Sequence, residues 1–229
     1  MGKEKDITMI AMKRLSFSKI MTYIKVSLPW YISVPVFSFS AMFPIMFGCD
    51  TYEDIGIMLD KCFSMLAVIT FSNVWHIEVQ QKTVEVYKLL PRRSRISDIL
   101  RRIVVRFIFL TSMVCICFIG YSIKGVHVYD TQEVVAMCIH AFLSVEAVMI
   151  LFGAISFFSA NLSGNLGVGI GTGIAVWMIL ASSAASKLPI WFNFFSYGVS
   201  NEWFKGAVTA IIVGFVLFIA GTILTDKNH

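Results

Sequence analysis

The sequence predicts an all-α membrane protein, and three observations lead to that class. Hydrophobic residues make up 57% of the 229-residue chain, whereas charged residues make up only 14%. A soluble domain of this length could not bury so much apolar surface. Long, nearly uncharged stretches recur along the chain, and the basic residues gather between them. We therefore predict one transmembrane domain over residues 1–229.

The apolar stretches predict six membrane-spanning helices, because about 20 helical residues cross a hydrocarbon core roughly 30 Å thick. The second is the weakest, since Asp60 and Lys61 interrupt its outer part, and five spans is the main alternative. Pro35 and Pro44 predict a bent first helix, and Pro29 is placed to begin it. The predicted spans are residues 28–48, 55–75, 103–123, 134–158, 166–186 and 206–224.

The basic residues orient these spans. The N-terminal segment, the segment after the second span and Lys227 together hold 15 of the 19 Lys and Arg residues. Basic loops face the cytoplasm, so both termini are predicted to be cytoplasmic. Within the N-terminal segment 1–27, residues 10–25 mix apolar and basic side chains and predict an interfacial amphipathic helix. Contact with anionic lipid explains the net charge of +5 without nucleic acid.

Motifs for independent catalysis are missing from the sequence. It has no G-x-x-x-x-G-K-[ST] motif, so no ATP site is predicted in this chain. Neither H-E-x-x-H nor G-x-S-x-G occurs. The five cysteines have no spacing typical of zinc ligands, and we expect them to pack as small apolar residues. We predict no catalytic residue, no metal site and no cofactor in this chain.

The most informative segment, residues 76–102, is basic and lies between the second and third predicted spans. Its first part alternates apolar and charged residues, which is typical of a short amphipathic helix, and Pro91 is expected to end it. Residues 92–102 then restart a helix that leads into the third span. An inert interfacial loop is the alternative. The predicted coupling residues are Glu78, Lys82, Thr83, Glu85, Leu90, Pro91, Arg92, Arg93 and Arg95.

This segment resembles the corresponding segment of ABC-2 type permeases, which carry a Glu, a Thr-x-Glu and a Leu-Pro with trailing basic residues after their second span. The matching residues here are Glu78, Thr83-Val84-Glu85, Leu90-Pro91 and the arginines that follow. Lys82 stands where many members of the family have Gly. The resemblance implies a coupling helix that docks on a separate ATPase subunit present in two copies, which binds ATP and Mg. It also implies a second permease chain and a bacterial cytoplasmic membrane.

Polar residues inside the spans are costly in lipid and are therefore candidate path residues. Glu146 and His140 lie in the fourth span, six residues apart, and point to different faces. Each is either a hydrogen-bonded structural residue or a contact that lines the path of the transported substrate. Phe71 and Asn73, near the end of the second span, complete the predicted translocation path.

Small residues in the fifth span predict close helix packing. Gly167/Gly171 and Gly169/Gly173 form two overlapping small-x-x-x-small pairs. They serve either packing within the chain or a dimer interface. The outer loop 187–205 is rich in aromatic residues, as expected at a membrane interface, and the resemblance implies that it caps the exit of the path.

The predicted function is that of a permease subunit of an ATP-driven exporter. Among such permeases, small ones without large outer domains resemble exporters of bacteriocins and phenol-soluble modulins, so the predicted cargo is an amphipathic or antimicrobial peptide. Drug or lipid export is one alternative. The membrane-embedded substrate-binding component of an energy-coupling importer is another, and an intramembrane enzyme that uses Glu146 and His140 is a third.

Overall fold

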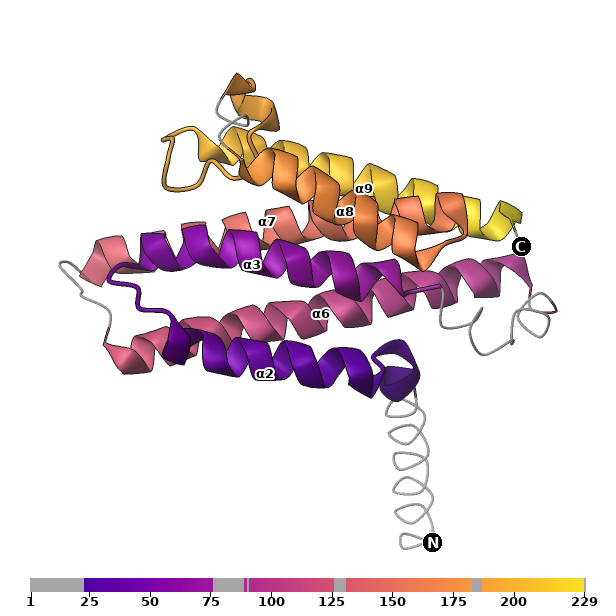
Figure 1. Ribbon diagram of the computed structural model, residues 1–229, viewed down its shortest axis with the longest axis horizontal. Coiled ribbons are helices and arrows are strands. Elements are labelled where there is room, and N and C mark those ends of the chain that lie inside the picture. The colour runs from indigo at the N-terminus through magenta and orange to yellow at the C-terminus, as the bar shows by residue number, and fades with distance from the viewer. Residues whose placement is uncertain (1–22, 76–88, 90, 126–130, 183–186, 229) are drawn as a thin grey trace, which may run out of the picture.

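The computed structural model describes residues 23–75, 89, 91–125, 131–182 and 187–228 (Figure 1). Every regular element among these residues is a helix, which confirms the predicted all-α class. Within this described part of the chain, four helices are long and apolar enough to cross a membrane: α3 (Tyr52–Ser72), α6 (Arg92–Lys124), α7 (Thr131–Ser163) and α9 (Trp203–Asn228). The chain is therefore compatible with a membrane-embedded protein.

Two apolar helices are shorter than the predicted spans. Helix α2 (Trp30–Met46) has 17 residues and α8 (Leu166–Ala181) has 16. At 1.5 Å per residue each is about 25 Å long, less than a hydrocarbon core of about 30 Å. The count of six spans is therefore not confirmed and stays a prediction. The second predicted span, which the sequence marks as the weakest, is the continuous 21-residue helix α3.

Successive helices run in opposite directions and form an elongated bundle (Figure 1). Helix α7 packs against α3, α8 and α9, whereas α2 packs mainly on α6. The starts of α2, α6 and α8 and the ends of α3, α7 and α9 lie at one end of the bundle, which we call the basic end (Figure 1). The opposite end carries residues 187–202 and the short helix η2 (Ile190–Phe192), and we call it the aromatic end.

The prolines of α2 explain how this helix pairs with α6. Pro29 directly precedes the first residue of α2, as the sequence predicts. Pro44 lacks an N–H, so the carbonyl of Ser40 loses its donor within the helix. The Cys117 thiol of α6 donates to that carbonyl at 3.3 Å, which is how neighbouring helices satisfy freed backbone groups in a membrane. Gly120 makes room for Pro44, since a Cβ there would lie 2.9 Å from the proline ring.

The glycines of α8 divide into two pairs with different surroundings. A Cβ at Gly169 would lie 2.5 Å from Ala160 of α7, and one at Gly173 would lie 2.7 Å from Val68 of α3. Gly169 and Gly173 therefore pack α8 against its own bundle. Gly171 has open space around its Cα, and Gly167 is exposed as well. The predicted role in chain packing holds for one pair, and the predicted dimer role stays a prediction for the other.

Substituting one glycine of each kind is expected to separate these roles. We expect Gly169→Leu to lower the free energy of unfolding by about 1–3 kcal/mol, because overpacking displaces α7. Gly171→Leu is the matched control, and its higher helix propensity should leave the bundle at least as stable. Thermal unfolding in detergent measures both variants. Equal stability of the two would contradict the tight packing seen at Gly169.

Candidate functional site

The basic end of the bundle is held together by one buried arginine. Arg106 of α6 is fully buried and donates from Nε to the Ser27 carbonyl at 2.9 Å. Its Nη1 donates to the Thr70 carbonyl and its Nη2 to the Asn73 carbonyl. One guanidinium therefore joins α6 to the end of the helical turn 23–27 and to the end of α3.

These acceptors explain why the sequence tolerates a buried cation here. The last carbonyls of a helix have no partner within the helix and carry the negative end of its dipole. Thr70 and Asn73 lie at the end of α3, and Ser27 ends the turn 23–27. Within the described residues, no carboxylate forms an ion pair with Arg106. The planar fork of five donors is suited to three separate carbonyls, and we call this arrangement the Arg106 clamp.

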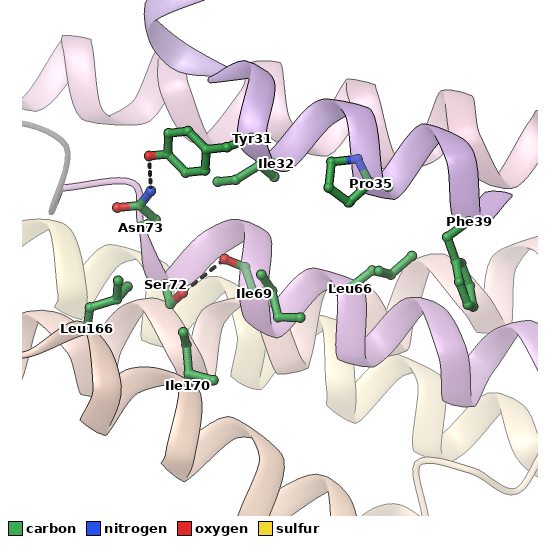
Figure 2. Close-up of a pocket in the computed structure, with 11 residues that line it drawn as sticks. Tyr31, Ile32, Pro35, Phe39, Leu66, Ile69, Ser72, Asn73, Leu166 and Ile170 are labelled. Carbon is green, nitrogen blue, oxygen red and sulfur yellow. Dashed lines mark hydrogen bonds between the residues drawn. The ribbon is translucent and has the colours of Figure 1, made fainter.

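Beside the clamp, a cleft of about 370 Å³ opens between α2, α3 and α8 (Figure 2). Tyr31 and Pro35 of α2 face Ile69 and Asn73 at the end of α3, and Ile170 of α8 closes another side. Apolar side chains form most of its wall. The remaining lining residues are Ile32, Val36, Phe39, Leu66, Ser72 and Leu166.

Polar groups are confined to one end of this cleft. The Asn73 side chain donates from Nδ2 to the Tyr31 hydroxyl at 2.7 Å, and its Oδ1 is buried without a hydrogen-bond partner. Ser72 is turned back to its own helix and donates to the Ile69 carbonyl at 3.0 Å (Figure 2). Asn73 therefore connects the cleft to the Arg106 clamp, because its side chain lines the cleft and its backbone carbonyl accepts a hydrogen bond from Arg106. An apolar cleft with one polar end fits an amphipathic ligand.

The four predicted path residues do not lie together. Asn73 lines the cleft, whereas Phe71 is fully buried in the core against Gly153 and Phe218. His140 lies at the aromatic end with its ring centroid 5.5 Å from that of Trp203.

Glu146 lies at the contact of α7 with α6. Thr111 donates to its Oε2 at 2.9 Å, and its Oε1 is buried without a hydrogen-bond partner. The residue is 8% exposed and is not among those that line the cleft. Its two predicted roles, structural residue and path contact, both remain predictions.

The structure shows the surroundings of one carboxylate within the second predicted span. Asp60 is 2% exposed and lies between α3 and α7. Ser144 donates to its Oδ2 at 2.8 Å. The predicted position of Asp60 on the outer side of the membrane stays a prediction. Asp60 and Lys61 are adjacent charges in the sequence, but they differ in exposure. Only Lys61 is exposed, since adjacent residues of a helix point about 100° apart.

A second pocket, of about 280 Å³, lies at the aromatic end. Glu53, His140, Trp203 and Tyr197 line this pocket, and of these four only Tyr197 is buried. The Tyr197 hydroxyl donates to the Met137 carbonyl at 3.3 Å. Burial and then the nearby Glu53 raise the pKa of the Tyr197 phenol, so this side chain stays neutral.

The predicted coupling residues fall partly outside the described residues. Glu78, Lys82, Thr83, Glu85 and Leu90 lie there. Pro91 directly precedes α6 and accepts hydrogen bonds from the Ser94 and Arg95 amides, so the predicted helix restart is confirmed. Arg92 and Arg93 are exposed in its first turn.

Cations at a helix N-terminus interact unfavourably with the helix dipole, and an anionic surface placed against them would offset this. A groove of about 510 Å³ runs along the first part of α6 and is lined by Arg93, Leu100, Arg101 and Tyr23. Tyr23 donates to the Asp98 carbonyl at 3.2 Å, and burial raises the pKa of its phenol. The groove therefore combines apolar walls with two exposed guanidinium groups.

Comparison with known proteins gives no match: no family model, no curated protein and no solved structure corresponds to this chain. The resemblance drawn from residues 76–102 therefore stays an expectation. Three features of the chain itself bear on its function: the Arg106 clamp, the cleft beside it and the basic segment that continues in sequence from the end of α3.

Proposed function

We propose that this chain is the permease subunit of an ABC-2 type exporter that moves amphipathic or antimicrobial peptides, powered by a separate ATPase subunit. One observation carries the proposal: the Arg106 clamp holds the end of α3, from which the basic segment 76–90 continues. A force applied to that segment reaches α3, α6 and the turn 23–27 together.

The cleft is the part of the structure that movement at the Arg106 clamp would change. Helices α2 and α3 form two of its walls. The clamp binds Ser27, which lies just before α2, and Asn73, which lies at the end of α3. Movement at the clamp therefore changes the spacing of the cleft walls. Apolar side chains with Tyr31 and Asn73 at one end suit a cargo that has an apolar and a polar part.

The partners follow from the same proposal. Two copies of this chain and two copies of the ATPase form the exporter, and the ATPase holds the ATP and Mg. Arg92 and Arg93, exposed at the start of α6, supply positive charge for an acidic surface of the ATPase or for anionic lipid. The basic end is then the cytoplasmic end.

Co-purification from the native membrane tests the proposal. The tagged chain is expected to retain a stoichiometric ATPase subunit, which mass spectrometry identifies. Glu85→Lys is expected to release this subunit, and Arg93→Glu to uncouple ATP hydrolysis from transport, since both reverse a charge within the predicted coupling segment, residues 76–102. Lys187→Glu is the matched control, because this exposed lysine lies at the aromatic end and its reversal should leave the complex intact.

Two results would contradict the proposal. Retention of the ATPase and of coupling in both Glu85→Lys and Arg93→Glu would remove the coupling segment from the mechanism. A chain that purifies alone and binds a small ligand tightly would instead favour the substrate-binding component of an importer.

A further inference from the structure

The surroundings of Asp60 are unusual for an ionisable side chain. Its Oδ2 accepts one hydrogen bond, from Ser144, and its Oδ1 is enclosed without any partner. No Lys, Arg or His in the described part of the chain forms an ion pair with it. An ionised carboxylate in this position keeps one hydrogen bond and loses its hydration, which is strongly unfavourable.

The phenol ring of Tyr197 separates Asp60 from the pocket at the aromatic end. The ring is so close to α3 that a Cβ added at Gly56 would lie 2.5 Å from Tyr197 Cε1 and 2.8 Å from the Ala141 Cβ of α7. Gly56 precedes Asp60 by about one turn, and Ala141 precedes Ser144 by about one turn. Tyr197 therefore fills the α3–α7 contact directly above the Asp60–Ser144 hydrogen bond.

The ligand that fits this site is a proton. The available oxygens are the two of the carboxylate and the hydroxyl of Ser144. A hard metal cation such as Ca²⁺ needs about six to eight oxygen ligands, and the described residues contain no cluster of metal-binding side chains. A proton needs one oxygen and removes the whole charge.

We propose that Asp60 is a proton-binding site inside the bundle, with Ser144 as its hydrogen-bond partner and Tyr197 as the barrier that separates it from the pocket at the aromatic end. The proton binds a carboxylate oxygen, and its loss leaves the anion held by the Ser144 hydroxyl. The site does not depend on whether the chain is a permease.

The other charged groups near Asp60 lie away from it. Lys61 is exposed on the next face of α3, and Glu53 and His140 line the pocket on the far side of Tyr197. Glu146 faces α6, and α8 contains no ionisable side chain. The proton on Asp60 therefore exchanges with the pocket only when Tyr197 leaves its place.

Carbodiimides test the proton site, because they react with the protonated form of a carboxyl group. The purified full chain in detergent is treated with dicyclohexylcarbodiimide over a range of pH, and mass spectrometry of its peptides locates the product. We expect modification of Asp60 whose yield falls at least about tenfold as the pH is raised to strongly alkaline values, because only the protonated carboxyl group reacts. No modification at any pH, or a yield independent of pH, would overturn the proposal.

A water-soluble carbodiimide tests the barrier. Tyr197→Ala should increase the modification of Asp60 by this reagent about tenfold, since it opens the α3–α7 contact to the pocket. Tyr197→Phe keeps the ring and loses only the bond to the Met137 carbonyl, so it should behave like the native chain. Equal modification in all three proteins would overturn the role of Tyr197. The first test uses the native chain and locates the modified residue in its peptides. Its outcome therefore does not depend on whether a variant folds.

Discussion

Replacing Arg106 by Gln is expected to destabilise the basic end of the bundle more than any other single change. The variant loses charge-assisted hydrogen bonds to the Ser27, Thr70 and Asn73 carbonyls. Hydrogen bonds to charged groups contribute about 1.5–3 kcal/mol each, and buried carbonyls left without donors cost more. We expect the free energy of unfolding to fall by at least about 3 kcal/mol, measured by denaturant titration in mixed micelles.

Two matched variants separate the fork from the charge at this position. Arg101→Gln removes an exposed guanidinium from the same helix and should change stability by less than about 0.5 kcal/mol. Arg106→Lys keeps the charge but cannot reach three carbonyls at once, so its stability should lie between the two. If Arg106→Gln and Arg101→Gln lose the same free energy of unfolding, the clamp does not stabilise the bundle.

Arg106 also shows where the sequence stops being informative. Its position near the start of the third apolar stretch is visible in the sequence, and so is the helix that begins at Arg92. Its acceptors lie 33 to 79 residues away in the chain. No periodicity predicts which helix ends meet at one side chain, because that depends on how the helices pack.

The path residues on α3 illustrate a second limit. Phe71 and Asn73 are two residues apart, and the sequence analysis predicts both in one path. Positions two residues apart point about 200° from each other on a helix. Phe71 is therefore buried in the core, whereas Asn73 lines the cleft. Helical spacing alone is enough to separate them. Helical spacing cannot predict which face of α3 lines the cleft, because that depends on how α2, α3 and α8 pack together.

The burial of Asp60 is a third feature that the sequence does not predict. A charge within an apolar stretch favours an assignment near the membrane surface. The structure buries its side chain between α3 and α7, where Gly56 and Ala141 lie close together and Ser144 supplies the hydrogen bond. Those small residues come from helices about 80 residues apart, and a single sequence gives no sign of their pairing.

The second large effect is expected from filling the cleft. Ile69 lines it from α3 and is 43% exposed, so Ile69→Trp should fold normally while the indole occupies the space between α2 and α8. If the cleft receives the cargo, we expect transport to fall at least about tenfold, since the indole keeps the cargo from burying its apolar surface against the cleft walls. Peptide export from cells or vesicles measures this, with ATP hydrolysis measured in parallel.

The parallel measurement distinguishes a blocked cleft from a damaged coupling. Ile69→Trp leaves the Arg106 clamp intact, so ATP hydrolysis by the proposed ATPase partner should continue while the proposed export stops. Ile179→Trp is the matched control, since Ile179 lies on an exposed face of α8 outside the cleft and its replacement should leave both unchanged. Normal export by Ile69→Trp would mean that the cargo crosses elsewhere. The contact of α6 with α7 at Glu146 would then be the next place to block.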